Sequence, residues 1–222
     1  MAKLHVLRVF VGENDASGNP LGVFLDGREV PEDARQGVAA DLGFSETVFV
    51  EDPARGELRI FTPTDELPFA GHPLVGTAWL LAREGFEVSV LRPPAGEVPV
   101  RHEDDTTYIS GRPEWAPPFE HIRFGSPEEV DALPGPPDGH ELAGVWAWEN
   151  EEAGRVRARV FPVRYGIQED EATGAHAVRL AARLGRKITI RQGKGSLILA
   201  EPRSDGMVEI GGRTELVEVR EH

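Results

Sequence analysis

A repeated pattern constrains this chain more than any other feature of its sequence. The run Arg59-Ile60-Phe61-Thr62-Pro63 in the first half is echoed by Arg159-Val160-Phe161-Pro162 in the second. Each copy is followed by an acidic stretch, then by a glycine and a histidine, and then by a segment rich in alanine and leucine that ends at a glycine. Three matches in the same order indicate a duplicated unit with pseudo-twofold symmetry.

Each half combines several strand-like segments with about one central helix. The helix-like segments of the two repeats are 74–84 and 172–184, and they stop at Gly85 and Gly185, where glycine is the usual helix terminator. A further helix is predicted at 31–42. Strands are predicted at 4–10, 21–25, 47–50, 57–61, 155–163, 188–191, 196–200, 207–210 and 216–219. This pattern predicts an α+β fold made of two similar units.

The best candidate for a linker is the stretch 111–139, which is rich in proline and shows little periodicity. We therefore predict an N-terminal domain at 1–110, which holds Glu46 and the Gly-His-Pro motif. The C-terminal domain at 111–222 would hold Asp170 and Gly174.

The charge balance excludes several classes of partner. The formal net charge is −14, which disfavours binding to nucleic acid and to anionic membrane surfaces. No apolar run approaches the roughly 20 residues that span a bilayer, and no signal-peptide pattern is visible, so a cytoplasmic protein is expected. The chain has no cysteine, which excludes a disulfide scaffold, thiolate metal sites and thiol acid/base chemistry.

Two glycine-containing motifs stand immediately before the repeated helices. Gly71-His72-Pro73 and Gly174-Ala175-His176 leave backbone N–H groups and the positive end of a helix dipole open to a ligand. Ordinary helix capping explains either motif alone about as well. The two together, at equivalent points of a repeat, favour a cradle for a carboxylate or another small anion between the domains.

Two carboxyl groups are candidates for proton transfer. Glu46 follows Phe44-Ser45 and precedes an apolar segment, where partial burial would raise its pKa toward acid/base work. Spacing alone favours a solvated loop residue for Glu46, and a role at the helix dipole for Asp170 within its acidic run. His72 and His176 could carry protons or bind a metal, but no ligand-like spacing supports a metal site. The segment 192–196 lacks the order of a phosphate loop and is interpreted as a hairpin.

A further set of motifs points to a known family. They are Ser17-Gly18-Asn19-Pro20, Phe44-Ser45-Glu46-Thr47-Val48-Phe49-Val50, Phe61-Thr62-Pro63, Glu66-Leu67-Pro68-Phe69-Ala70-Gly71-His72-Pro73, Glu169-Asp170-Glu171-Ala172-Thr173-Gly174-Ala175, Gln192-Gly193 and Val208-Glu209-Ile210-Gly211-Gly212. In this order the chain resembles the PhzF family, named for the isomerase of phenazine biosynthesis. The resemblance is weakest from about residue 103 to 155.

The resemblance implies a diaminopimelate-epimerase-like fold, in which two domains each wrap a strand barrel around a central helix. It also implies a homodimer, no cofactor, and a site in the cleft that binds a small carboxylate-bearing substrate. The residue matching Glu46 would shuttle a proton, and those matching His72 and Asp170 would assist. Substrate contacts are expected from the two helix starts and their surroundings: Asn19, Gly71, Pro73, Gly174, Ala175 and His176. The last strand is expected to cross back to the first domain.

Three departures from the family pattern separate two hypotheses. Glu171 stands where the family has proline, Ala175 stands where it has serine, and the middle region is shorter. The first hypothesis is an isomerase of a small carboxylated metabolite that works through Glu46. The alternative is a catalytically degenerate protein of the same family that binds a metabolite or acts in assembly.

Overall fold

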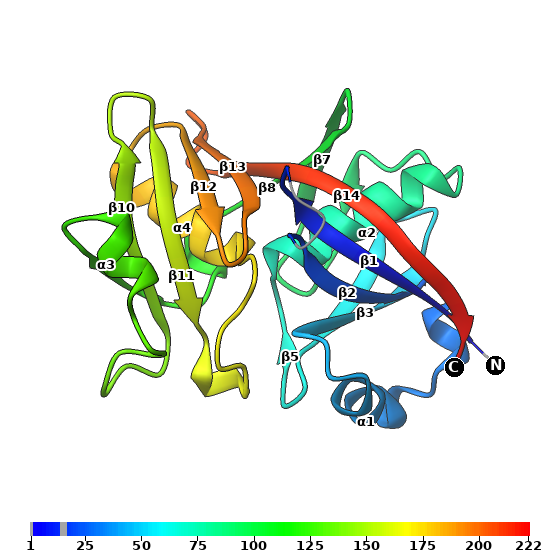
Figure 1. Cartoon of the computed structure of the whole chain (residues 1–222). Coiled ribbons are helices and arrows are strands. Elements are labelled where there is room, and N and C mark those ends of the chain that lie inside the picture. The colour runs from blue at the N-terminus through cyan, green and yellow to red at the C-terminus, as the bar shows by residue number, and fades with distance from the viewer. Residues whose placement is uncertain (1, 14–16) are drawn as a thin grey trace.

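Two helices at equivalent points of the sequence repeat form the centres of the two halves of the molecule (Figure 1). The computed structural model describes residues 2–13 and 17–222. Helix α2 (Gly71–Arg83) is buried along almost its whole length, as an apolar helix surrounded by strands must be. Helix α4 (Gly174–Leu184) is amphipathic and buries one face. The α+β class expected from the sequence is confirmed.

The first half is mainly a mixed sheet that curls around α2. Its strands lie in the order β5-β4-β3-β2-β1, and β8 and β7 continue it beyond the last strand of the chain. Their bounds are β1 (Lys3–Val11), β2 (Asn19–Phe24), β3 (Glu46–Asp52), β4 (Glu57–Phe61), β5 (Glu66–Leu67), β6 (Val90–Leu91), β7 (Val98–Glu103) and β8 (Thr106–Gly111). Helix α1 (Glu32–Leu42) lies outside this sheet and packs against a separate apolar cluster.

The second half repeats the arrangement around α4. Its strands lie in the order β13-β12-β11-β10-β9, and β9 and β12 each run parallel to one neighbour. The elements are β9 (Glu120–Arg123), α3 (Pro127–Asp131), β10 (Ala143–Asn150), β11 (Arg155–Phe161), β12 (Ile188–Gln192) and β13 (Ser196–Pro202). Three short 3-10 turns cover Gly27–Glu29, Pro113–Trp115 and Val163–Tyr165.

One long strand joins the halves. Strand β14 (Val208–Glu221) pairs with β13 and β8 along its first part and with β1 along the rest. In Figure 1 this red strand passes over the top of the molecule from the second half to the first. Strand β14 thus pairs with strands of both halves. The domain boundary between 110 and 111 stays a prediction.

The helix ends agree closely with the sequence pattern. Gly43 and Gly185 follow α1 and α4 in the left-handed conformation, with φ of 67° and 64°, which a residue with a side chain adopts less readily. The start of α2 differs from the prediction, because the helix begins at Gly71 rather than at residue 74. Pro73 lies within the first turn of α2, where the backbone N–H that proline lacks would have no partner inside the helix. The proline therefore does not mark a position before the helix.

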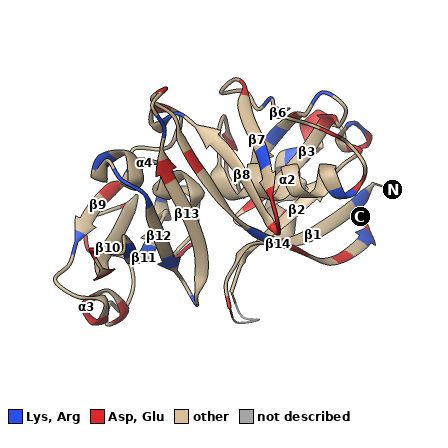
Figure 2. Ribbon diagram, turned by 90° about the horizontal axis from the view of Figure 1, so that it is seen from above, with Lys and Arg blue, Asp and Glu red and all other residues tan. Residues whose placement is uncertain are grey.

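Charged residues of both signs are interspersed along the elements of both halves (Figure 2). Among the described residues, no helix is long and apolar enough to span a membrane.

Candidate active site

The N-terminal ends of α2 and α4 meet at the junction of the two halves. A Cβ atom added to Gly71 would lie 2.6 Å from the Cα of Gly174, and one added to Gly174 would lie 2.8 Å from the Cα of Gly71. Only glycine permits this approach, so the repeated motif serves to bring two helix ends together.

Both helix ends leave their first N–H groups without a side-chain cap. The N-cap residues, Ala70 and Thr173, make no side-chain capping bond, and neither helix carries an acidic residue in its first turn. A helix end normally needs such partners. These two ends line one pocket between the halves, to which Gly71, His72, Gly174 and Ala175 contribute.

Glu46 stands at the first position of β3 and lines this pocket. Its Oε2 lies 3.5 Å from the Nε2 of His72, the second residue of α2. Both atoms are buried, and neither has a hydrogen-bond partner among the described residues. A buried polar atom without a partner is costly, which makes this pair a candidate for contact with a ligand.

Asp170 lines the same pocket from the second half and is held by several donors. Its Oδ1 accepts a bond of 2.7 Å from the Asn19 amide, and its Oδ2 accepts one of 2.6 Å from the Thr173 hydroxyl. The buried Gln192 amide donates to the Asp170 backbone oxygen at 2.8 Å and to the Thr173 hydroxyl at 2.9 Å. This network fixes the carboxyl group in one orientation.

Asn19 connects the two carboxyl groups. Its amide nitrogen uses its two hydrogens on Asp170 and on the backbone oxygen of Ala172, the latter at 2.9 Å. Its oxygen accepts a bond of 3.1 Å from the hydroxyl of Ser45, the residue next to Glu46. The start of β2 therefore lies between the acid/base candidates of the two halves.

Burial sets the protonation states in the pocket. It raises the pKa of Glu46 well above the usual value, and repulsion from Asp170 adds to this. Burial also raises the pKa of Asp170, although bonds from Thr173 and Asn19 oppose the rise. Burial lowers the pKa of His72 to about 3. The short distance between His72 and Glu46 is therefore a contact with a neutral imidazole at neutral pH, not an ion pair.

The rest of the pocket is apolar. Its walls include Leu67, Phe69, Phe119, Tyr165 and Ile167, and no lysine or arginine is among the described residues that line it. Positive potential for an anionic ligand therefore has to come from the helix ends.

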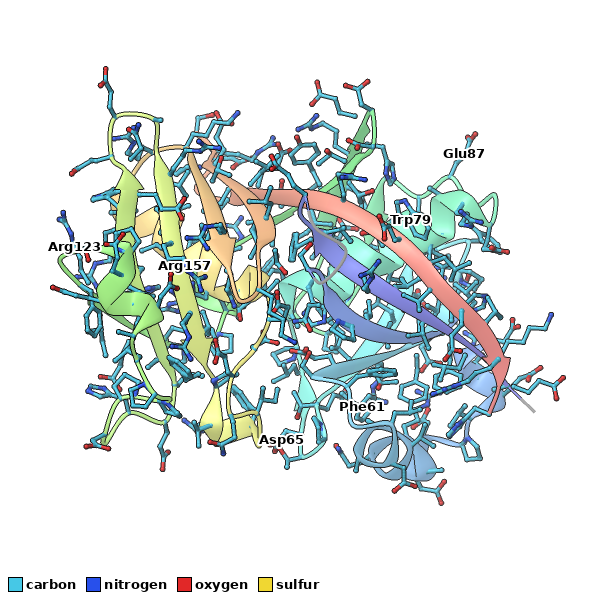
Figure 3. All side chains as sticks on the ribbon, in the orientation of Figure 1. Phe61, Asp65, Trp79, Glu87, Arg123 and Arg157 are labelled. Carbon is cyan, nitrogen blue, oxygen red and sulfur yellow. The ribbon has the colours of Figure 1, made fainter. Side chains whose placement is uncertain are left out.

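A second, more open hollow shares Asp170 and Ile167 with this pocket and reaches Asn19, Ser45 and Glu171. The two halves also meet where Gly166 approaches Thr64. A Cβ on Gly166 would lie 3.6 Å from the Thr64 side chain, and the neighbouring Asp65 is labelled at this junction in Figure 3.

The structure brings most of the predicted site residues together, but not all of them. Glu46, His72, Asp170, Gly71, Gly174 and Ala175 line the pocket, and Asn19 contacts it through Asp170. Pro73 is buried in the first turn of α2 and is not a lining residue. His176 is fully buried and does not line the pocket; its ring packs behind the pocket wall, 5.7 Å from the ring of Phe119 and 4.8 Å from that of His121.

Several polar members of the site were not singled out from the sequence. Ser45, Thr173 and Gln192 complete the network around the two carboxyl groups. Ser45 and Thr173 adjoin candidates, and that adjacency is the signal that could have identified them. Gln192 belongs to the Gln192-Gly193 motif of the family resemblance, but that motif does not indicate a place in the site, because only the fold brings β12 against the start of α4. No cluster of three or more metal-ligating side chains occurs among the described residues.

Comparisons with known proteins agree with this geometry. A family model described as phenazine biosynthesis-like protein (PhzC-PhzF) matches residues 9–135. Trans-2,3-dihydro-3-hydroxyanthranilate isomerase from Pseudomonas fluorescens is 33% identical over 222 residues, which cover 82% of this chain and 80% of that protein.

Two solved structures show the same fold. A phenazine biosynthesis PhzC/PhzF protein from Clostridium difficile (strain 630) matches with a TM-score of 0.79 and 20% identity, over 100% of this chain and 99% of that one. A hydroxyproline epimerase from Agrobacterium vitis, with bound trans-4-hydroxy-L-proline, matches with a TM-score of 0.67 and 11% identity, over 99% and 90%. The diaminopimelate-epimerase-like fold expected from the sequence is confirmed.

Proposed function

The chain belongs to the PhzC-PhzF family of phenazine biosynthesis-like isomerases, and on that premise we propose that it isomerises a small carboxylated metabolite by moving a proton through Glu46. The observation that carries the proposal is the pair formed by Glu46 Oε2 and His72 Nε2. Both atoms are buried, lack partners among the described residues, and face each other at 3.5 Å in one pocket.

Two carboxyl groups with raised pKa values suit proton transfer at neutral pH. Like charges in a buried pocket repel, so Glu46 and Asp170 do not both ionise readily. Asp170 has the donors that stabilise a carboxylate, which leaves Glu46 as the group that carries the proton. The Glu46 acid donates its proton to one carbon, and the resulting carboxylate removes a proton from another. The enzyme then ends in the protonation state in which it began.

The substrate carboxylate would bind at the two uncapped helix ends. Residues at the starts of α2 and α4 line the same pocket without a side-chain cap, and the two helix dipoles add positive potential there. The apolar walls suit an unsaturated or ring-shaped body rather than a polyol or a phosphate ester. Neutral His72 would accept a hydrogen bond from the Glu46 acid and orient it.

The proposal needs no cofactor, because both proton positions are supplied by side chains of this chain. The homodimer and the cytoplasmic location also remain predictions. Light scattering on the purified chain measures the dimer directly.

The test reads hydrogen exchange from solvent into candidate substrates. We would incubate carboxylated metabolites with the protein in deuterated water, beginning with the trans-2,3-dihydro-3-hydroxyanthranilate named for the relatives, and record deuterium incorporation by mass spectrometry. Glu46→Gln should reduce incorporation by roughly 100-fold or more, because it removes the acid/base group and keeps its shape.

The control is Glu97→Gln, which changes an exposed glutamate in a surface ion pair and should leave incorporation unchanged. Full incorporation by Glu46→Gln on a turned-over substrate would exclude the proposal. Tight binding without any exchange, in wild type as in the variant, would instead favour the degenerate binding protein.

A further inference from the structure

Glu171 joins two segments that lie far apart in the sequence. Its carboxylate accepts bonds from the Lys194 backbone N–H, at 2.8 and 3.0 Å, and a bond of 2.7 Å from the Ser196 hydroxyl. The Ser196 oxygen in turn accepts a bond of 2.8 Å from the backbone N–H of Gly18. Gly18 precedes Asn19, whose amide holds Asp170 at 2.7 Å. The contacts therefore form a closed ring that begins and ends at adjacent residues, Glu171 and Asp170.

The turn between β12 and β13 is built to receive this carboxylate. Gly193 has a φ of +54°, and a Cβ there would lie 2.3 Å from the Glu171 Oε2. On the other side of the turn, Arg157 of β11 donates to the Gly193 oxygen at 3.0 Å (Figure 3). The turn is thus held between a cation and an anion. The hairpin expected at 192–196 is confirmed, and it has a part in the site that its sequence did not indicate.

The first half of the molecule fits closely against the same turn. A Cβ on Gly12 would lie 2.1 Å from the Gly195 oxygen, so the end of β1 contacts the turn directly. The Ser17 hydroxyl accepts a bond of 2.7 Å from the Gly12 N–H. The backbone on both sides of residues 14–16 is therefore placed against the second half, just before Asn19.

From these contacts we infer that Glu171 is a positioning residue, which holds the 193–196 turn and, through Ser196 and Gly18, keeps the Asn19 amide on Asp170 across the junction of the two halves. The inference rests on the proposed function in so far as Asp170 belongs to the site. It concerns a position where this chain departs from its family pattern. Proline in that place has no carboxylate, so the ring through Ser196 depends on this chain's own glutamate.

The test follows the titration midpoint of the Asp170 carboxyl in the full chain. We would label the protein with ¹³C-carboxyl aspartate, assign the Asp170 signal with Asp170→Asn, and titrate by NMR without any ligand. Ser196→Ala breaks the link to Gly18 and keeps the negative charge of Glu171. The bond from Asn19 favours the ionised form of Asp170. A weaker bond should therefore raise the Asp170 midpoint, by about 0.5 pH units or more.

A second variant gives the opposite result. Glu171→Gln keeps an oxygen acceptor for Ser196 and removes the charge that repels the Asp170 carboxylate, so the midpoint should fall. Glu201→Gln removes a surface ion pair between Glu201 of β13 and Lys187, and it should leave the Asp170 midpoint unchanged. Both test substitutions are close in shape to the native residue and should fold.

An unchanged or lowered midpoint in Ser196→Ala would overturn the inference. A lower melting temperature with an unmoved midpoint would reduce Glu171 to a purely structural role and would overturn it equally. Because this titration needs no substrate, its outcome is separate from that of Glu46→Gln. Failure of the deuterium-exchange test would exclude the proposed reaction without affecting the inference about Glu171. Failure of the titration test would exclude the inference about Glu171 without affecting the proposed reaction.

Discussion

Ala175, in the first turn of α4, is the pocket residue at which a change of side chain should most directly alter the binding of an anion. Its methyl group lines the pocket beside an uncapped helix end, where the family pattern has a serine. An alanine offers an anion only its backbone N–H, whereas a serine adds a hydroxyl donor. In the proposed function, the side chain at position 175 decides how many hydrogen-bond donors this helix end offers to a carboxylate.

Ala175→Ser should strengthen the binding of a carboxylate probe such as anthranilate by roughly 10-fold or more, because one hydrogen bond to a charged group contributes about 1.5–3 kcal/mol. Isothermal titration calorimetry measures the change. The control is Ala182→Ser, on the same helix and only partly buried. Equal affinity in wild type and Ala175→Ser would show that the carboxylate does not bind at the start of α4.

The burial of the His176 ring should make the stability of the protein depend on pH. The ring is fully buried, both nitrogens lack partners among the described residues, and His121 lies against it. Burial lowers the pKa of His176 well below its usual value, and the pKa of His121 falls to about 4. Both rings are therefore neutral in the folded protein at pH values where the unfolded chain already binds protons.

Below about pH 6.5 the unfolded state takes up protons at His176 and the folded state does not, so the free energy of unfolding falls as the pH falls. His176→Leu removes this contribution. Relative to the variant, wild type should lose up to about 1.4 kcal/mol for each pH unit below that point. Urea denaturation at pH 7, 6 and 5 measures the difference. Parallel curves for the two proteins would show that His176 is not held neutral.

At the scale of elements, the contact between the starts of α2 and α4 decides whether a site exists. The two helices belong to different halves, and each contributes a glycine to the contact. The proposed anion site needs both helix ends, because residues from the starts of α2 and α4 line one pocket.

Gly71→Ala and Gly174→Ala should each push the two helix ends apart. We expect a loss of about 1–3 kcal/mol in the free energy of unfolding, as for other insertions into packed interiors, together with loss of carboxylate-probe binding. Gly37→Ala is the matched control, since residue 37 lies on the exposed side of α1 and no atom lies within 4 Å of the added carbon. It should stabilise the protein by about 0.5–1 kcal/mol. Full probe binding by Gly71→Ala would contradict the cradle.

At the scale of the whole molecule, β14 makes the two halves interdependent. The strand pairs with β13 in one half and with β1 and β8 in the other, and the contacts of Gly12 and Gly18 with the 193–196 turn add a second junction. An inter-domain cleft that relied on a flexible linker would let Glu46 and Asp170 drift apart. A shared strand restricts that movement.

We therefore expect a single cooperative unfolding transition, in which the calorimetric enthalpy equals the van't Hoff enthalpy. Differential scanning calorimetry tests this directly. Two resolved transitions, each with about half of the enthalpy, would show that β14 does not couple the halves.

The sequence by itself determined the duplication, the α+β class and the stops of the main helices, and its family motifs made Glu46, His72 and Asp170 the candidates for the site. These follow from local chemistry, because periodicity, glycine at helix ends and short motifs are written in neighbouring residues. Tertiary structure alone decided which candidates meet. It brought Gly71 against Gly174 and Asn19 against Asp170, and it buried His176 behind the pocket wall. It also turned Glu46 from a residue that spacing alone places on the surface into a buried acid, because its pKa depends on desolvation by residues distant in the chain.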